Sequence, residues 1–316
     1  MVYAVSFTDV QDACSRLEGT VNRTPVVQSP RIDELAGRSV FLKCENLQHV
    51  GAFKFRGACN AIEILGSSAE KGVCTHSSGN HAQALALAAK KRGVPAYIVM
   101  PSNAPDVKVR GVLSHDAEIT FCEPNIEARS KAADSIIDRT GSAFVHPFDN
   151  PDVIAGQGTA AVEMIEECAN LDAIMAPIGG GGLLSGSCIA TREMLPEARL
   201  FGAEPVGADD AAKSLEAGKF VPQTSPDTIC DGLLTSLGEL TWPILRDHLE
   251  KVVTVSDDEV RKAMVLLHDE FQMIVEPSGA ISLAAILKDE FKSLGGIDRV
   301  GIILSGGNVD KGALPF

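Results

Sequence analysis

The sequence predicts an α/β protein with two domains, each built on a central, mostly parallel sheet that is flanked by helices. Short apolar runs alternate with helical stretches along most of the chain, as expected for repeated strand–helix units. The expected strands are continuously apolar rather than alternating, which is typical of parallel strands covered on both faces. Residues 67–147 are expected to form a small mobile domain, inserted in a large domain made of residues 1–66 and 148–316.

The individual elements follow from local patterns. The expected strands are the apolar runs 39–44, 72–76, 95–100, 117–121, 143–146, 172–178, 199–203 and 299–304. Thr8 and Gln11 have the spacing of a capping box at the start of the first helix, and Ser256 and Glu259 repeat that spacing later. Gly93 is expected to end an alanine-rich helix. In sheets of this kind, ligands bind where strands end and loops lead into helices.

Composition excludes several classes of function. The chain has 316 residues, 45% of them hydrophobic, and a net charge of -14, so its acidic surface is expected to repel nucleic acid. The N-terminus lacks the pattern of a signal peptide, and no apolar run is long enough to cross a membrane. The eight cysteines form no Cys-x-x-Cys pair. Reduced cysteines in a cytoplasmic protein are therefore expected.

Lys54 lies between Phe53 and Phe55, which shield it on both sides. Burial lowers the pKa of a lysine because it disfavours the charged form, and a neutral amine forms Schiff bases with carbonyl compounds. The alternative is an ordinary solvated lysine whose stem packs on Phe53.

Four successive glycines, Gly179, Gly180, Gly181 and Gly182, follow an expected strand and open a helix. Glycines allow a close approach of the backbone to a ligand, and a helix N-terminus favours anions, so this loop indicates a phosphate site. A simple tight turn is the alternative. The dinucleotide-binding spacing of glycines is absent, although Glu204 stands at roughly the right distance for a ribose contact. Walker, Gly-x-Ser-x-Gly and His-Glu-x-x-His motifs are also absent from the sequence.

Two other polar loops follow expected strands. The run 77–81, Ser-Ser-Gly-Asn-His, suits a carboxylate or phenolate oxygen, although serine and asparagine also cap helices. The run 305–308, Ser-Gly-Gly-Asn, follows the last strand and by itself is an ordinary turn.

Glu204 and Asp210 lie six residues apart after another strand. Their carboxylates suit a hard divalent cation, which prefers oxygen ligands. An acidic helix N-terminus explains the same residues equally well.

The four features occur together and in a fixed order. With a lysine between phenylalanines, the Ser-Ser-Gly-Asn-His loop, the tetraglycine loop and the final Ser-Gly-Gly-Asn, the chain resembles the serine racemase and serine/threonine dehydratase family of pyridoxal 5'-phosphate (PLP) enzymes, of the tryptophan synthase β-like fold. The resemblance extends from Thr24 to Asp310. It implies that the large domain binds PLP and that the protein is a homodimer.

The resemblance also implies residue roles. Lys54 forms the Schiff base, and Phe53 lies against the cofactor ring. The phosphate binds the glycines Gly179, Gly180, Gly181 and Gly182. Asn80 bonds the phenolic oxygen, and Ser305 bonds the pyridine nitrogen.

The remaining implied roles concern the substrate and a metal ion. The substrate carboxylate is received by Ser77, Ser78, Asn80 and His81. Near the substrate side chain lie Arg129 and Ser236. The ligands of a divalent cation, magnesium or else manganese or calcium, are Glu204, the carbonyl of Ala208 and Asp210.

The implied reaction is β-elimination from a β-hydroxy amino acid to a 2-oxo acid and ammonia. Serine, threonine and 3-hydroxyaspartate are the candidate substrates. Ser78 could return a proton on the opposite face, which would give serine racemisation, and a protein that is primarily a racemase is the alternative. Arg129 could pair with a second carboxylate of the substrate, or it could be a surface arginine.

The sequence departs from the family where relatives bind a nucleotide effector, because His49, Val50 and His115 stand at the corresponding positions. The sequence therefore leaves open whether a nucleotide effector binds. Feedback control by isoleucine is not expected, because the sequence ends at Phe316 without the regulatory domain of longer relatives. From other classes, a nicotinamide-dependent oxidoreductase and a non-catalytic ligand-binding relative are the competing hypotheses.

Overall fold

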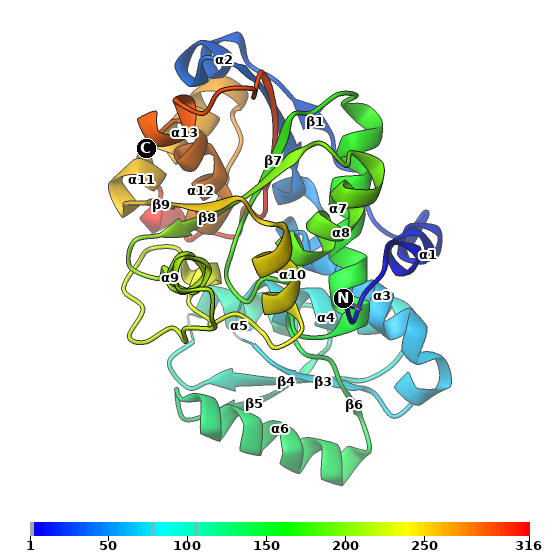
Figure 1. Ribbon diagram of the computed structural model, residues 1–316. Helices are drawn as coiled ribbons and strands as arrows, with labels where there is room; N and C mark the ends of the chain where they lie inside the picture. Colours follow the sequence, from blue (N-terminus) through cyan, green and yellow to red (C-terminus); the bar gives the residue numbers. More distant parts are fainter. Residues whose placement is uncertain (1–2, 78, 105) are drawn as a thin grey trace.

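The computed structural model describes residues 3–77, 79–104 and 106–316. Two sheets organise the chain (Figure 1). The larger has six strands in the order β1-β2-β10-β7-β8-β9, and its core pairs are parallel, with only the short β1 antiparallel to β2. Its strands are β1 (Val26–Val27), β2 (Ser39–Cys44), β7 (Ala173–Pro177), β8 (Arg199–Pro205), β9 (Lys251–Val255) and β10 (Arg299–Leu304).

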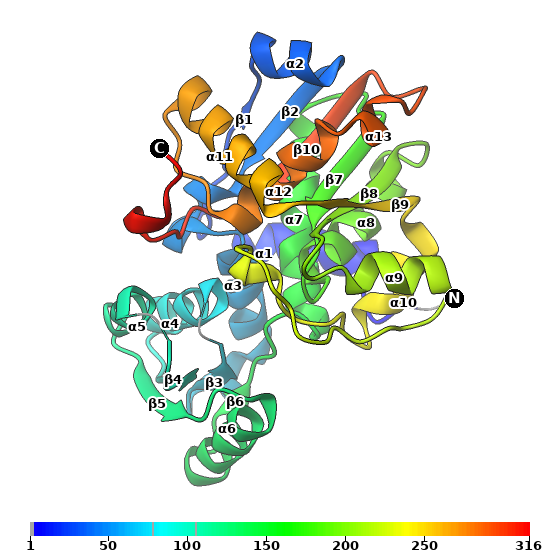
Figure 2. The same ribbon diagram turned by 90° about the vertical axis from the view of Figure 1, so that its left-hand side faces the viewer.

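The smaller sheet has four parallel strands in the order β5-β4-β3-β6. They are β3 (Val73–His76), β4 (Ala96–Pro101), β5 (Glu118–Cys122) and β6 (Ala143–Phe144). Figure 2 shows this sheet and α6 projecting at the lower left, away from the larger sheet. The α/β class with two parallel-dominated sheets is confirmed.

Helices cover both faces of each sheet. They are α1 (Phe7–Leu17), α2 (Pro30–Ala36), α3 (Lys54–Leu65), α4 (Asn80–Arg92), α5 (Asp106–Leu113), α6 (Ile126–Thr140), α7 (Pro151–Glu167), α8 (Gly182–Met194), α9 (Asp210–Ala217), α10 (Thr241–His248), α11 (Asp257–Phe271), α12 (Pro277–Ile286) and α13 (Asp289–Lys292). On the large sheet, one hydrophobic core lies under α2, α11 and α12, and another lies under α1, α7, α8 and α10. In the small sheet, α3 and α4 pack on one face and α6 on the other.

Local signals explain most helix ends. The capping box predicted at Ser256 and Glu259 is confirmed, and so is the end of α4 at Gly93, which adopts the left-handed conformation. The capping box predicted at Thr8 was wrong. The first helix begins two residues earlier, with Ser6 as its cap and Asp9 as the reciprocal partner, because a carboxylate suits the positive helix N-terminus.

Two strands were not predicted. Both β1 and β9 are edge strands of the large sheet. The β1 strand has two residues, and β9 carries polar residues among its valines, so neither has the continuous apolar run of a central strand. Among the residues that the structure describes, no helix is both long and apolar enough to span a bilayer.

Candidate active site

Lys54 is the first residue of α3 and lies where the two sheets meet. Its Nζ donates a hydrogen bond to the carbonyl of Pro147 at 2.8 Å and lies 5.1 Å from the centroid of the Phe53 ring. The backbone N–H of Phe53 donates to the carbonyl of Ser305 at 3.0 Å. Desolvation lowers the pKa of Lys54 to about 8. A significant fraction of this amine is therefore uncharged near neutral pH, and the amine is available as a nucleophile or base.

The segment after Pro147 brings the tetraglycine loop to Lys54. A Cβ added to Gly180 would lie 2.2 Å from the Phe148 ring, and one added to Gly182 would lie 3.1 Å from the Phe148 Cβ. These two glycines are required because the Phe148 side chain packs directly on the loop. Lys54 hydrogen-bonds the residue that precedes Phe148, so the amine and the loop belong to one site.

The tetraglycine loop presents unused hydrogen-bond donors. Gly181 has a φ of +89°, which a residue with a side chain rarely adopts, and the loop leads into the first turn of α8. All four glycines are buried, yet within the described part of the chain no hydrogen bond takes the backbone N–H of Gly179, Gly180 or Gly181. Buried N–H groups need an acceptor, and a helix N-terminus favours a negative one.

Asn80 begins α4 at the end of β3 and is fixed by two residues of the larger sheet's loops. Its Nδ2 donates to the Glu276 carboxyl at 2.7 Å, and its Oδ1 accepts from the Asn308 Nδ2 at 2.9 Å. The Glu276 carboxyl also accepts from the backbone N–H of Asn308 at 3.1 Å. Burial raises the pKa of Glu276 to about 8. Among the described residues, one N–H of the Asn80 amide has no acceptor.

The other predicted members of the two polar loops lie close by. Ser305 is buried, and its hydroxyl donates to the Ser278 carbonyl at 3.2 Å. Ser77 accepts from the backbone N–H of Gly79 at 3.4 Å. His81 is buried, with one ring nitrogen 3.3 Å from the Val145 carbonyl and the other without a hydrogen-bond partner. Ser78 lies outside the described residues.

Arg129 and Ser236 come from separate elements. Arg129 is on α6 of the small sheet, where its Nε is buried without a hydrogen-bond partner and its charge is among the influences that lower the pKa of His76. Ser236 lies in the loop before α10, and its Oγ accepts from the backbone N–H of Gln223 at 2.8 Å. No hydrogen bond in the described residues joins either side chain to Lys54 or Asn80.

The predicted metal ligands form a compact cluster at the end of β8. Both oxygens of Glu204 accept backbone N–H groups at the start of α9, from Ala211 at 3.0 Å and from Ala212 at 2.8 Å. Asp210 accepts from the Leu237 N–H through one oxygen, while its other buried oxygen has no partner.

The electrostatics of that cluster are unfavourable as it stands. Burial raises the pKa of Glu204 well above its usual range and that of Asp210 to about 6. Within residues 3–77, 79–104 and 106–316, no hydrogen bond reaches the Ala208 carbonyl. Nor does any group of three or more His, Cys, Asp or Glu side chains gather there as a metal site. A cation at this cluster would thus need the carbonyl as a third protein ligand.

Three residues of the site were missed from the sequence, and the contact made by a fourth, Asn308, was not foreseen. Pro147 contributes a carbonyl, which has no side-chain signature, and Phe148 contributes a packing surface. Glu276 stands immediately before Pro277, the first residue of an apolar helix. A carboxyl at the start of a fully apolar helix is the signal that could have identified it. Asn308 belongs to the predicted 305–308 loop, but its partner Asn80 is 228 positions away.

A model of one enzyme family matches residues 17–306, almost the whole chain, and is described as pyridoxal-phosphate dependent enzyme. The chain belongs to this family of PLP-dependent enzymes. The competing oxidoreductase and non-catalytic hypotheses receive no support from it.

Individual relatives are similar to this chain over nearly their full length. The chain is 48% identical to a serine racemase of Dictyostelium discoideum over 98% of this chain and 97% of the relative. It is 44% identical to a beta-hydroxyaspartate dehydratase of Paracoccus denitrificans, with 100% of both chains covered. The structure of maize serine racemase superposes with a TM-score of 0.97 at 45% identity, covering 99% of this chain and 96% of that chain.

Proposed function

We propose that this PLP-dependent enzyme eliminates water from a β-hydroxy amino acid, giving a 2-oxo acid and ammonia, and that it also racemises serine. The observation that carries the proposal is the desolvated Lys54 amine, with a pKa of about 8, beside a loop of buried and unused N–H groups. The relatives described above are named a serine racemase and a beta-hydroxyaspartate dehydratase, and each matches at least 98% of this chain. The Dictyostelium relative favours a second candidate, an enzyme that is primarily a serine racemase.

The described residues fit PLP. Its phosphate would be held by Gly179, Gly180, Gly181 and Gly182, whose loop offers three N–H groups that need acceptors. Lys54 would carry the cofactor, with Phe53 against its ring. When bound, PLP withdraws electrons from the Cα of an amino acid, which makes loss of the α-proton and of the β-substituent feasible.

The protein groups around the ring have distinct tasks in this proposal. Asn80 would donate its free N–H to the phenolic oxygen, because its other polar contacts are already taken by Glu276 and Asn308. Ser305 would contact the pyridine nitrogen with a neutral hydroxyl, which cannot balance a positive charge as a carboxylate would. Stabilisation of negative charge at Cα is then weaker, which favours prompt loss of the β-hydroxyl.

Lys54 would also act as the base that removes the α-proton, since a pKa near the working pH suits proton transfer. The Pro147 carbonyl orients its amine through the 2.8 Å hydrogen bond. For the substrate carboxylate we propose Ser77, Ser78, Asn80 and His81. Ser78 is also the proposed proton donor on the opposite face, which would account for racemisation.

Arg129 and Ser236 are the proposed contacts of the substrate side chain. The Arg129 Nε is buried and has no hydrogen-bond partner within the described part of the chain, so it could donate to an anion. A second carboxylate, as in 3-hydroxyaspartate, would satisfy it. Serine and threonine remain candidate substrates, since both carry the β-hydroxyl.

We further propose that Glu204, the Ala208 carbonyl and Asp210 bind magnesium, manganese or calcium. Two buried carboxylates, a carbonyl without a partner and one unpaired oxygen of Asp210 form an oxygen donor set that suits a hard cation. Water molecules would complete its coordination.

The assembly is proposed to be a cytoplasmic homodimer with a small mobile domain at 67–147 and a large PLP-binding domain at 1–66 plus 148–316. All strands of the four-stranded sheet lie within 67–147, which supports this division. An exposed apolar pair supports dimerisation. Leu47 is 46% exposed and Ile274 is 43% exposed, and the Asn46 side chain joins their two segments.

A substrate panel tests the function. Purified enzyme with PLP and magnesium would be given L-serine, L-threonine or 3-hydroxyaspartate, and both 2-oxo acid release and the chirality of the remaining amino acid would be measured. We expect 2-oxo acid from at least one substrate and none with Lys54→Ala. The proposal fails if no substrate gives 2-oxo acid or changes chirality.

A further inference from the structure

Four charged side chains form a closed cluster beneath the start of α3. Lys43, Glu45 and Arg56 are 0% exposed and Glu163 is 9% exposed. The cluster contains two positive and two negative charges, so it carries no net charge. Thr24 completes it, with its hydroxyl donating to Glu45 at 2.5 Å.

Arg56 is the centre of this cluster and makes six hydrogen bonds. Its guanidinium forms a two-pronged pair with Glu45, with both distances 2.8 Å, and a second with Glu163 at 2.6 and 2.8 Å. The last two bonds go to the Thr159 hydroxyl and the Asn22 carbonyl, both at 3.2 Å. Desolvation opposes the charge, but the Glu45 and Glu163 carboxylates outweigh it and raise the pKa of Arg56.

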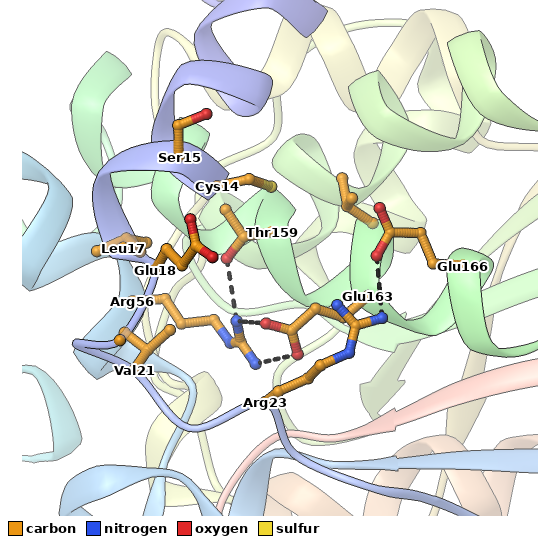
Figure 3. Close-up of a pocket in the computed structure, with 12 residues that line it drawn as sticks. Cys14, Ser15, Leu17, Glu18, Val21, Arg23, Arg56, Thr159, Glu163 and Glu166 are labelled. Carbon is orange, nitrogen blue, oxygen red and sulfur yellow. Dashed lines mark hydrogen bonds and ion pairs between the residues drawn. The ribbon is translucent and has the colours of Figure 1, made fainter.

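Arg56 lies in the wall of a pocket. Figure 3 shows its guanidinium directed at Glu163 and Thr159 along the wall of a pocket between α1 and α7. This pocket has a volume of ≈ 380 Å³, and Arg23 pairs with Glu166 among its lining residues. Although Arg56 lines this pocket, its side chain is fully buried, and its hydrogen bonds to Glu45 and Glu163 fix the orientation of the guanidinium.

A buried ion cluster is a weak source of stability, since apolar residues of similar size often stabilise a fold at least as well. Ion pairs with a fixed fork geometry do impose one orientation on the elements that they join. Arg56 joins the first turn of α3 to η1 (Glu45–Leu47) and to α7. Phe53, at the cap position of that turn, makes no capping hydrogen bond, so the turn is held by contacts such as those of Arg56 rather than by a cap.

Close backbone contact between α3 and α7 supports the same conclusion. A Cβ on Gly156 would lie 2.7 Å from the Cα of Gly57, and the Gly57 N–H donates to the Gln157 side chain at 3.1 Å. A shift of α3 along α7 is therefore restricted at Gly57, and its rotation is restricted by the Arg56 fork. Lys54 is two residues before Arg56 on the same turn.

We propose that Arg56 is a positioning residue, which holds the first turn of α3 so that the Lys54 amine stays at the Pro147 carbonyl. This inference rests on the proposed role of Lys54. The cluster is electrically neutral, and desolvation is the single cause that lowers the pKa of Lys54, so Arg56 acts through position and not through its charge. A misplacement of about 1 Å at a reacting group can reduce a rate about 100-fold.

The test compares Arg56→Lys and Arg56→Met with the matched control Lys43→Met. The control removes a different cation from the same cluster. Lys43 lies on β2, and in the described residues it bonds only Glu163 and the Thr24 carbonyl, each at 2.6 Å. For each holoenzyme, kcat and KM, the thermal midpoint and the yield of pyridoxylated Lys54 after borohydride reduction would be measured.

For Arg56→Lys, which keeps the charge but loses the fork, we expect kcat to fall about 10- to 100-fold with KM changed less than threefold. Its yield of pyridoxylated Lys54 should also fall below that of the wild type. Lys43→Met should lower the thermal midpoint with kcat within twofold of the wild type. If Arg56→Met does not fold, Glu45→Gln, which removes one partner of the fork, should reproduce the Arg56→Lys phenotype.

The proposal is overturned if Arg56→Lys keeps kcat and labelling within twofold of the wild type, whatever its stability. It is also overturned if Lys43→Met lowers kcat as much as Arg56→Lys does, because the cluster would then serve the fold alone. Failure of the proposed function is distinguishable, because in that case the wild-type enzyme itself would show no pyridoxylation of Lys54.

Discussion

Desolvation of the Lys54 amine disfavours its charged form, which predicts that this residue weakens the PLP-free fold. Its amine has lost solvation and has one hydrogen bond, to the Pro147 carbonyl, with no carboxylate as a partner in the described residues. Lys54→Met removes the ionisable group and keeps an unbranched side chain of similar length. The PLP-free variant should therefore be more stable than the PLP-free wild type.

The size of the effect follows from two opposing contributions. Lowering the pKa of Lys54 from 10.5 to about 8 corresponds to about 3 kcal/mol of instability at pH 7. Loss of the hydrogen bond to Pro147 costs about 1 kcal/mol. The expected net gain in the free energy of unfolding is about 2 kcal/mol, or about 3 °C in thermal midpoint for a chain of this length.

The pH dependence has a definite sign. The folded pKa of Lys54 is below its unfolded value, so the penalty is complete below pH 8 and is relieved as the pH rises from about 8 to 10.5. The advantage of Lys54→Met should therefore fall to about zero by pH 10. Buried cysteines such as Cys188, whose pKa is raised to about 12, lower stability at high pH in both proteins and cancel in the difference.

Urea unfolding of both PLP-free proteins at pH 7 and pH 10 measures this difference. Lys43→Met is the control, because Lys43, unlike the half-buried Lys54, is fully buried and is paired with Glu163 at 2.6 Å. It should lose about 3–5 kcal/mol, since an uncompensated buried charge remains. The reasoning is refuted if Lys54→Met is no more stable than the wild type at pH 7, or if its advantage does not change with pH.

Three further predictions concern the loops and the junction of the sheets. Gly181 has a φ of +89°, and an added Cβ would lie 2.9 Å from Leu245, so Gly181→Ala should lower the free energy of unfolding by about 2–5 kcal/mol and remove most PLP affinity. The control Gly218→Ala, with a φ of +64° and open space around it, should lose about 1 kcal/mol and keep its PLP affinity. Absorbance titration with PLP measures the affinity of both variants. Asp210→Asn should abolish the rise in thermal midpoint that magnesium gives the wild type, whereas an equal rise in both proteins would exclude the proposed metal site. Lys108 on α5 pairs with Asp231, which joins the two proposed domains. Lys108→Glu should therefore raise KM several-fold, and Lys108→Glu combined with Asp231→Lys should restore it. A double variant with a KM no better than that of the single variant would show that this pair does not hold the proposed domains together.

Much of the fold could be predicted because central strands carry their own signal. The runs at β2 and β10 are buried on both faces and were predicted with their observed ends. Edge strands escape this reasoning, as β9 shows, because one side of the strand has no neighbour and polar residues are tolerated there.

Some residues of the site could likewise be predicted from the sequence, and others could not. The tetraglycine loop is recognisable because four glycines follow a predicted strand, and Lys54 is recognisable because it lies between two phenylalanines. The Pro147 carbonyl and Glu276 are not, because their roles arise from contacts between positions 93 and 196 residues apart in the chain. Burial of a carboxyl such as Glu276 depends on how the whole fold closes around it.

The central claim is that Lys54 carries the PLP of this enzyme, and the most direct test is to locate the cofactor chemically. Holoenzyme would be reduced with borohydride and digested, and the pyridoxylated peptide would be sequenced by mass spectrometry. Our account predicts the label on Lys54 and no labelled peptide from Lys54→Ala. A label on another lysine, or none on the wild-type protein, would contradict it.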